Sequence, residues 1–310
     1  MHAAVLRYFE AVAEDGSIRR ASERLHISPS AVNRQILKLE DYLGTPLFER
    51  RPDGMRLTDA GELVLRHAQA TLHDFARLRG DIDRLRGVVS GDVTIATLDS
   101  LNVQFLPEAL AKFIAAYPAV QVRVIACDPV EIMQAVVQGN ADLGLTFSPA
   151  LRRGITVLKD APCPMCAIMT PDHTLAARKS VSLDDCGAHP LLYQESTGSM
   201  QLFFGEEMEA FKSAHKPVAI SNTLALLKRL LLRGVGIAFY TRMGFAEELA
   251  SGRLVAVPLE GEPLSTLRLC LIAPSERKPT VASHAMAEHL QQALAQFATG
   301  LDPRLLSLRR

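Results

Sequence analysis

Apolar positions along residues 17–44 follow two short helical patterns separated by a tight turn. Ser17 can cap a first helix with an apolar side of Ile18, Ala21 and Leu25. Ser28 can cap a second, with Pro29 at the first helical position, where a missing N–H costs nothing. The inner stripe of the second helix comprises Ala31, Val32, Ile36, Leu39 and Leu43, before Gly44 ends it. Two helices joined this closely predict a helix-turn-helix, whose second helix usually enters the major groove of DNA.

The outer face of the second helix carries hydrogen-bond donors and no acid. These donors are Ser30, Asn33, Arg34, Gln35 and Lys38. Asparagine can read adenine and arginine can read guanine with paired hydrogen bonds, while Lys38 suits phosphate. An ordinary solvated helix face could have the same residues. We favour a DNA-reading face because the caps, the turn and the next segment agree with it.

A hairpin is predicted directly after this helix. The turn Pro52-Asp53-Gly54 separates two short runs that contain Arg50, Arg51 and Arg56. Arginines at a hairpin tip can contact phosphate or the minor groove. The predicted DNA-contact residues are Ser28, Ser30, Asn33, Arg34, Lys38, Arg50 and Arg51.

A long amphipathic helix is expected from Thr58 to about Arg86, with no proline inside it. Its roughly 28 residues would make a rod about 40 Å long, too long to be covered by a domain of this size. Burial against the rest of the chain would hide its apolar stripe, but we favour dimerisation, because a dimer places two recognition helices on one face of DNA. The predicted dimerisation residues are Leu65, Leu72, Phe75 and Ile82.

From residue 91 the pattern changes to alternating strands and helices. The continuous apolar runs predict strands covered on both faces, as in a parallel sheet. The expected strands are 93–98, 120–126, 141–147, 155–170, 190–193, 218–220, 236–240, 254–257 and 267–273, and the clearest helices are 102–117, 129–138 and 283–297.

Polar loops follow several of these strands. Asp99-Ser100-Leu101-Asn102 precedes one helix and residues 194–200 precede another. In open α/β sheets ligands bind at the carboxyl ends of strands, and free helix N–H groups with hydroxyls suit an anion. Serine and threonine before a helix are also ordinary caps. Two such loops, with Thr146 and Phe147 at a third strand end, favour a ligand cleft.

Composition limits the class of protein and its compartment. The 310 residues carry no formal net charge and are 48% hydrophobic and 22% charged, as in a soluble globular protein. No signal peptide is evident at the N-terminus, and the apolar run 224–240 contains three basic residues, so a cytoplasmic location is expected. Because the charge is balanced, attraction to DNA must come from local basic residues and should depend strongly on salt.

The five cysteines suit a reducing compartment. Only Cys163 and Cys166 are close in sequence, and no second pair or histidine set completes a zinc site. In a strand, residues three apart point to opposite faces and bridge poorly. We favour structural cysteines and retain a redox or metal sensor as an alternative.

An ordered series of motifs in the first 65 residues resembles the N-terminal domain of LysR-type transcriptional regulators. The series is Leu6-RYFEAVAEDGSIRRASERL, Ser28-PSAVNRQI, Leu39-E-x-x-LG, Leu47-FER and Leu57-T-x-AGE. Asn33 stands where the family more often has serine, which bears on operator choice. Ser22 replaces the second alanine of a usual pair, a packing change.

Residues 90–300 resemble the effector-binding module of the same family, two α/β subdomains related to periplasmic binding proteins. The markers are the spacing from Ser100 to Leu106-Pro107, Gly139-x-Ala141-Asp142-Leu143, Pro171-x-His173-x-Leu175 and Gly234-x-Gly236-Ile237-Ala238. The resemblance implies one subdomain of 88–161 plus 265–300 and a second of 162–264. It also implies an effector cleft lined by Ser100, Leu101, Asn102, Thr146, Phe147, Ser196, Thr197 and Thr223.

Enzymatic signatures are weak in this sequence. Gly234-Val235-Gly236 lacks a third glycine and enters a strand, the reverse of a dinucleotide fingerprint. Thr197-Gly198-Ser199 lacks the glycine of a nucleophile elbow. An enzyme fused to a DNA-binding domain therefore remains only an alternative, and no catalytic residue, metal site or cofactor is expected.

The sequence thus predicts an α/β protein with an N-terminal all-α winged helix-turn-helix domain, a linker helix and a two-subdomain effector domain resembling periplasmic binding proteins. The expected boundaries are 1–58, 59–87 and 88–310. Its predicted function is sequence-specific regulation of transcription, controlled by a small-molecule effector. The expected partners are double-stranded DNA, a small-molecule effector and further copies of the chain as a dimer or tetramer. An anionic metabolite is one candidate for the effector, although Asp99 beside Ser100 adds a negative charge at the rim of the cleft. RNA polymerase is a further candidate.

Overall fold

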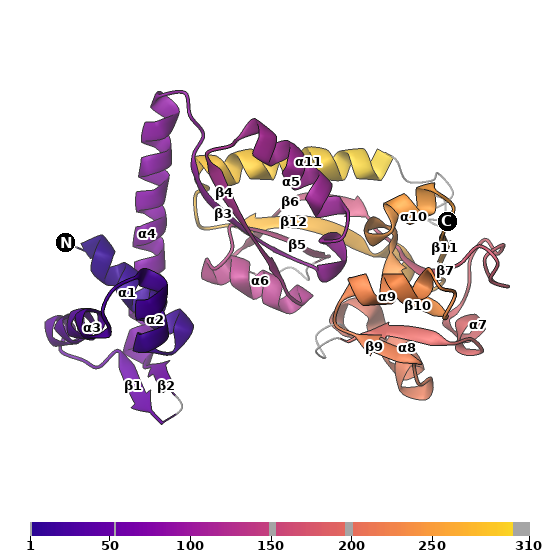
Figure 1. The fold of residues 1–310 in the computed structure, drawn as a ribbon, viewed down its shortest axis with the longest axis horizontal. Coiled ribbons are helices and arrows are strands. Elements are labelled where there is room, and N and C mark those ends of the chain that lie inside the picture. Colours follow the sequence, from indigo (N-terminus) through magenta and orange to yellow (C-terminus); the bar gives the residue numbers. More distant parts are fainter. Residues whose placement is uncertain (1, 53, 149–152, 196–200, 300–310) are drawn as a thin grey trace. The chain divides into compact units, whose positions relative to one another are not determined.

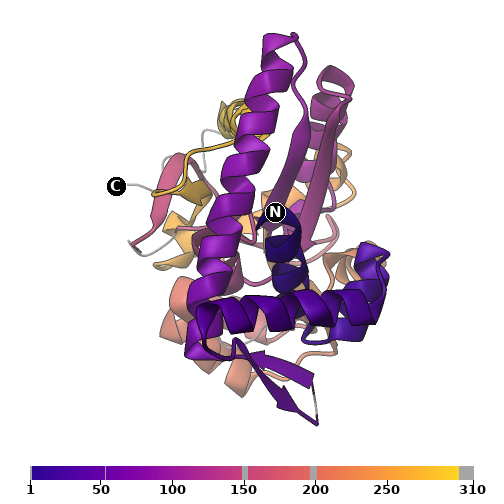
Figure 2. The same cartoon turned by 90° about the vertical axis from the view of Figure 1, so that its left-hand side faces the viewer.

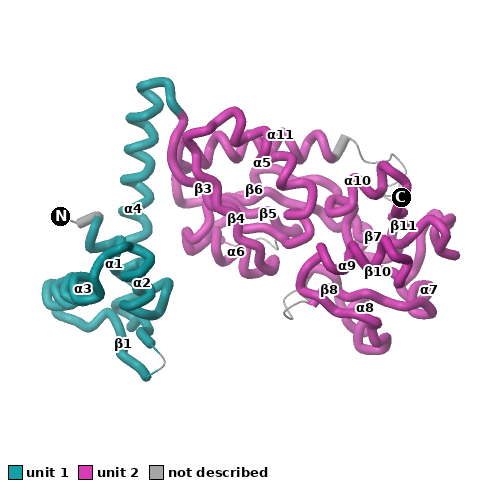
Figure 3. Tube along the Cα trace, in the orientation of Figure 1, with its two compact units in different colours: residues 1–88 teal, residues 89–310 magenta. Residues whose placement is uncertain are grey.

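The computed structural model describes residues 2–52, 54–148, 153–195 and 201–299. The chain divides into two compact units, Met1–Val88 and Val89–Arg310 (Figure 3). Separate clusters of buried apolar side chains lie in the two units, so each has a hydrophobic core of its own.

Unit 1 begins with three helices and a hairpin (Figure 1). The helices are α1 (His2–Asp15), α2 (Ile18–Leu25) and α3 (Pro29–Leu43); the hairpin pairs β1 (Phe48–Arg51) with β2 (Gly54–Leu57), and α4 (Asp59–Leu85) follows. The predicted caps are confirmed: Ser17, Ser28 and Thr58 accept the backbone N–H groups of Arg20, Ala31 and Gly61. Because these signals are local, the helix-turn-helix and the hairpin form where the sequence predicts them.

The core of unit 1 gathers the inner faces of its helices around Phe9, whose ring centroid lies 5.0 Å from that of Phe48. Val32 and Ile36 of α3 are fully buried in this core. Leu43, expected on the same stripe, is instead 43% exposed. It lies in the last turn of α3, where the burial of that helix has ended.

Helix α4 is a straight rod that extends well beyond the other helices of unit 1 (Figure 2). Near its start Ala68 is fully buried, and Leu65 and Leu72 pack partly against the core of unit 1. Further along, Phe75 and Ile82 are 50% and 44% exposed. The predicted dimerisation stripe is therefore divided between a part that packs on its own unit and a part that is open.

The first sheet of unit 2 has the strand order β4-β3-β5-β12-β6. Helices α5 and α11 lie on one face and α6 on the other (Figure 1). The strands are β3 (Gly91–Thr97), β4 (Val120–Ala126), β5 (Leu143–Phe147), β6 (Ile155–Pro162) and β12 (Arg268–Pro274); the helices are α5 (Phe105–Ala116), α6 (Pro129–Gln138) and α11 (Val281–Thr299). The chain returns to this sheet through β12, which lies between β5 and β6 although it comes much later in the sequence.

The second sheet has the order β11-β7-β10-β8-β9. Its strands are β7 (Met165–Met169), β8 (Leu191–Gln194), β9 (Ala219–Ser221), β10 (Ile237–Thr241) and β11 (Val255–Pro258). The helices around it are α7 (Leu183–Gly187), α8 (Gln201–Ala214), α9 (Leu224–Leu231) and α10 (Ala246–Ala250). Short 3-10 turns also occur, η1 (Asp99–Leu101), η3 (Arg242–Gly244) and η4 (Leu264–Thr266). Among the described residues, no helix is long and apolar enough to cross a membrane.

The sheets differ from the sequence-based expectation in three ways. Both are mixed rather than parallel, because β12 runs antiparallel to β5 and β6, and β7 runs antiparallel to β10 and β11. Strand β4 is an edge strand on which Val124 and Ile125 are more than a third exposed. Helix α5 begins at Phe105 rather than residue 102, because 99–101 form η1 first.

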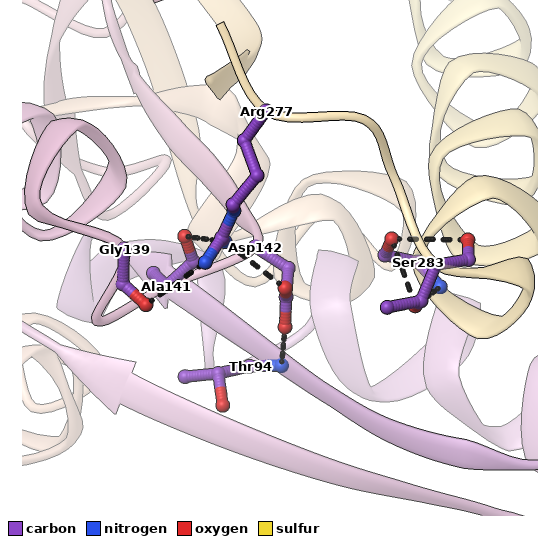
Figure 4. A network of polar contacts seen from close by, with 7 residues as sticks. Thr94, Gly139, Ala141, Asp142, Arg277 and Ser283 are labelled. Carbon is purple, nitrogen blue, oxygen red and sulfur yellow. Dashed lines mark hydrogen bonds and ion pairs between the residues drawn. The ribbon is translucent and has the colours of Figure 1, made fainter. Parts of the chain in front are cut away.

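A polar network holds the amino-terminal side of the first sheet and explains one of the motifs (Figure 4). The Asp142 carboxylate accepts the backbone N–H of Thr94 at 2.9 Å and a guanidinium N–H of Arg277 at 3.2 Å. Arg277 also donates to the carbonyl oxygens of Gly139 and Ala141, each at 3.4 Å. These contacts anchor the carboxyl end of α6, so its amino end is held at the opposite edge of the sheet.

Candidate functional site

The outer face of α3 presents the predicted DNA-contact residues to solvent. Ser30, Arg34 and Lys38 are exposed, and Asn33 is half-buried. Ser28 is exposed as well as capping the helix. The arrangement offers donors along one helix face, which suits acceptors on base edges and phosphates.

A carboxylate on α3 positions the hairpin relative to the recognition helix. Glu40 Oε1 accepts the backbone N–H of Leu47 at 2.8 Å and of Phe48 at 3.2 Å, where β1 begins. The hairpin is also tied to the loop after α1, because Met55 donates its N–H to the Gly16 carbonyl at 2.8 Å. The hairpin is thereby oriented as one piece with α3.

The hairpin arginines have different partners. Arg50 donates a guanidinium N–H to Asn33 Oδ1 at 2.9 Å, which links β1 to the middle of α3. Arg51 pairs with Glu49, the shorter contact being 2.6 Å, so its charge is partly offset. Since arginine only donates, the contact with Arg50 also establishes which way the Asn33 amide faces.

A cavity of about 570 Å³ lies between the two sheets of unit 2, at the carboxyl ends of their strands. Among the described residues its apolar wall comprises Leu98, Ala126, Cys127, Pro129, Phe147, Met165, Leu192, Phe204, Met208 and Phe239. Its polar wall comprises Asp99, Ser100, Asp128, Glu131, Tyr193, Gln194, Glu195, Lys212, Asn222, Thr223, Tyr240 and Thr241. This size and mixture are typical of a site for a small organic ligand.

The predicted effector residues fall into three groups. Ser100, Phe147 and Thr223 line the cavity. Leu101, Asn102 and Thr146 are outside its lining; Leu101 and Thr146 are buried in the core, where the Thr146 hydroxyl donates to the Pro129 carbonyl at 3.5 Å. Ser196 and Thr197 lie outside the described residues.

Several lining residues were missed by sequence reasoning. Tyr193 and Tyr240 lie on β8 and β10, close to the carboxyl ends of those strands, and Lys212 lies on α8. Burial raises the pKa of Tyr193 to about 12 and lowers the pKa of Lys212. The available signal was the strand end itself: the expected strands 190–193 and 236–240 both stop at a tyrosine.

Asp99 connects the two halves of the cavity wall. Its Oδ2 accepts the backbone N–H of Leu224, the first residue of α9, at 2.6 Å. Close by, a Cβ on Gly244 would lie 2.5 Å from Leu224 Cδ2 and 3.0 Å from the Ser100 carbonyl oxygen. The turn η1, which follows β3 and carries Asp99 and Ser100, therefore packs directly against η3 and α9 beside the second sheet.

The cysteines have no arrangement suited to metal or redox chemistry in the part of the chain that the structure describes. Cys163 and Cys166 are buried in different apolar clusters, and burial raises the pKa of each to about 12. A redox-sensing thiol is usually exposed and has a lowered pKa. Within the same described ranges, no group of three or more potential ligands is placed to hold a metal ion.

Comparisons with known proteins match both units of the chain. The family described as "Bacterial regulatory helix-turn-helix protein, lysR family" matches residues 4–62, and the family "LysR substrate binding domain" matches residues 86–295. The RuBisCO operon transcriptional regulator of Allochromatium vinosum is 30% identical over 264 residues, which cover 83% of this chain and 85% of that protein.

Solved structures share the fold. A full-length OxyR variant from Pseudomonas aeruginosa aligns with a TM-score of 0.67 and 19% identity, over 95% of this chain and 94% of the other. Full-length CbnR in complex with its target DNA aligns with a TM-score of 0.57 and 21% identity, over 94% of this chain and 100% of the other. With its helix-turn-helix unit and its two-sheet unit both matched, the chain belongs to the LysR family of transcriptional regulators.

Proposed function

We propose that the chain is a homo-oligomeric regulator whose affinity for operator DNA is set by a small molecule in the cavity of unit 2. The observation that carries this proposal is the cavity between the carboxyl ends of both sheets. A molecule there touches both halves of unit 2, so it stabilises one arrangement of the halves over others. A ligand that binds one arrangement better shifts the population toward it.

Operator DNA is read by α3 and the hairpin. Asn33 and Arg34 face base edges, while Ser28, Ser30, Lys38, Arg50 and Arg51 hold the backbone and the minor groove. Because the whole chain has no net charge, phosphate contacts of these few residues supply the non-specific attraction. Binding should therefore weaken steeply as salt rises.

Oligomerisation uses the open part of α4. Phe75, Leu78 and Ile82 are each 44–54% exposed on this rod, and Leu85 is 88% exposed. A second copy that covers this stripe pairs two recognition helices on one DNA face. RNA polymerase is the partner through which a DNA-bound dimer or tetramer acts on transcription. The protein acts in the cytoplasm. It catalyses no reaction itself.

The test is a footprint of the full-length protein on the DNA upstream of its own gene, with and without small molecules. The proposal expects a protected region with two half-sites, and a change in its length or in the protein concentration needed when an effector is added. Protection that no cavity-bound molecule alters would contradict the regulatory part. Turnover of an added metabolite by the full chain would contradict the absence of catalysis.

A further inference from the structure

The charged groups on the cavity wall are mostly acidic. Among the described lining residues, Asp99, Asp128, Glu131 and Glu195 carry carboxylates, and Lys212 is the one basic residue. Residues 196–200, Ser-Thr-Gly-Ser-Met, follow Glu195 in the sequence and contain no charged residue. The field inside the cavity is therefore negative, which favours a cationic group and opposes an anionic one.

Among the described residues of the cavity wall, α6 and α9 begin at the cavity, and both amino ends already have carboxylates. Asp128 and Glu131 form a capping box at the start of α6, in which Glu131 accepts the Asp128 N–H at 3.0 Å. At the start of α9 the Leu224 N–H is taken by Asp99. Free N–H groups at helix amino ends are a common means of binding an anion. Here the protein's own carboxylates occupy that role, so an anionic ligand would have to displace them.

Lys212 does not reverse this balance. Its Nζ lies 4.0 Å from Glu209 Oε1, so a carboxylate of its own helix partly neutralises it. The same Nζ lies 6.0 Å from the ring centroid of Tyr193 and 5.9 Å from that of Phe204. Aromatic faces at this distance attract a cation, and Lys212 places an ammonium group beside two of them, although burial lowers its pKa.

The rest of the wall offers rings and unpartnered hydroxyls. Phe147 lies 5.8 Å from Phe204 between ring centroids, and Tyr193 lies 6.4 Å from Phe239. The Tyr193 and Tyr240 side chains are only 7% and 3% exposed, and neither hydroxyl has a hydrogen-bond partner among the residues that the structure describes. Buried hydroxyls are nearly always paired, so these two lining residues each have a polar atom whose hydrogen bonding is incomplete.

From these contacts we infer that the cavity binds a small organic cation, an ammonium group on an apolar or aromatic body, and that Asp99 is a residue that excludes anionic ligands. This assignment rests on the proposed function, since it names the ligand class of the same cavity. It replaces the anionic metabolite expected from the sequence. That expectation relied on free N–H groups at the loop 99–102 and the helix after it, whereas the Asp99 carboxylate is itself an acceptor that takes the N–H of Leu224.

The test is calorimetry of the full-length protein with three probes that share one body: 2-phenylethylamine, 2-phenylethanol and phenylacetate. For ligands of about nine non-hydrogen atoms, affinities near the millimolar range are expected. The amine should bind at least about tenfold more tightly than the carboxylate, the ratio expected for one partly screened charge interaction. Tighter binding of phenylacetate, or no binding of the amine, would overturn the inference.

Two variants separate the role of Asp99 from a general charge effect. Asp99→Asn keeps an oxygen that can accept the Leu224 N–H but removes the charge, so the amine-to-carboxylate preference should fall by about tenfold. Asp184→Asn, an exposed acid of α7 outside the cavity lining, should leave the preference unchanged. An unaltered preference in Asp99→Asn would overturn the role of that residue.

Folding is checked by circular dichroism. If Asp99→Asn does not fold, Glu195→Gln, at an exposed residue directly after β8, provides the same comparison, with a smaller loss of preference expected. No loss in that variant would count against the inference.

Failure of this inference and failure of the proposed function give different results. If the amine binds but operator affinity does not respond to it, the ligand class stands and the regulatory coupling fails. If phenylacetate binds more tightly and operator affinity responds to it, the regulator stands and the ligand class is wrong. Binding is measured without DNA, so the two outcomes do not depend on each other.

Discussion

The hydrogen bond between Arg50 and Asn33 leads to a prediction about which base the recognition helix reads. Because Arg50 donates to Asn33 Oδ1, that oxygen faces the hairpin and the amide NH₂ is left for DNA. Adenine recognition needs both the oxygen and the NH₂ of asparagine, whereas guanine presents two acceptors in the major groove. We therefore expect the wild-type protein to prefer guanine over adenine at the base that Asn33 contacts.

The informative perturbation is Arg50→Ala, with Arg51→Ala as a matched control. Both remove one hairpin charge, but Arg50 donates to Asn33 whereas Arg51 pairs with Glu49, so the first change is the one that releases the amide. A paired contact to the right base is worth about 1–3 kcal/mol, so Arg50→Ala should shift the base preference toward adenine by about 5- to 150-fold. Arg51→Ala should weaken binding to all operators alike.

The assay is selection from a randomised operator library, followed by anisotropy titrations on operators that differ only at the selected base. A loss of overall affinity would accompany either variant and is not diagnostic. An adenine preference in the wild-type protein, or the same preference in wild-type and Arg50→Ala, would refute the reasoning.

Three further predictions concern stability, reactivity and assembly. Gly61→Ala should lower the free energy of unfolding by about 1–3 kcal/mol despite the better helix propensity of alanine, because its Cβ would lie 2.1 Å from the Leu47 carbonyl oxygen; a thermal melt as high as that of the wild type would disprove this. Cys166 should resist a thiol reagent at pH 8 in the folded protein and react after unfolding, since burial raises its pKa to about 12. Because the Cys166 thiol of the unfolded chain ionises at a lower pH, the free energy of unfolding should fall as pH rises from about 9 toward 12. Rapid labelling of Cys166 in the native protein at pH 8 would contradict its burial. Phe75→Glu with Ile82→Glu should give monomers in light scattering, whereas a dimer that survives both changes would exclude the open stripe of α4 as the interface.

Sequence reasoning was accurate where the physical cause is local. The helix ends at Ser17, Ser28, Thr58 and the left-handed Gly44 depend on residues within three or four positions in the sequence. The hairpin follows from a turn signal of the same range. These features also carry the residues that we predict to contact DNA, so their positions on α3 and the hairpin could be predicted from the sequence.

The cavity could be predicted only in part, because its wall depends on contacts between distant segments. Asp99 meets Leu224 across 125 positions of sequence, and no local pattern shows that pairing. Strand β12 follows every strand of the second sheet in the sequence, yet it pairs antiparallel with strands of the first sheet. The expectation of parallel strands did not include this return. Lys212 and Phe204 lie on a helix that the sequence analysis did not delimit, so their side chains were not assigned to the cavity.

The most direct test of the account is the operator affinity of the full-length chain at a concentration of 2-phenylethylamine that calorimetry shows to be saturating. Coupling between two sites of one protein is typically about 1–3 kcal/mol, and it is reciprocal. We therefore predict that the occupied protein binds operator DNA with an affinity changed by about 5- to 150-fold, and that operator DNA changes the affinity for the amine by the same factor. An unchanged operator affinity with the cavity fully occupied would contradict the claim that this cavity controls DNA binding.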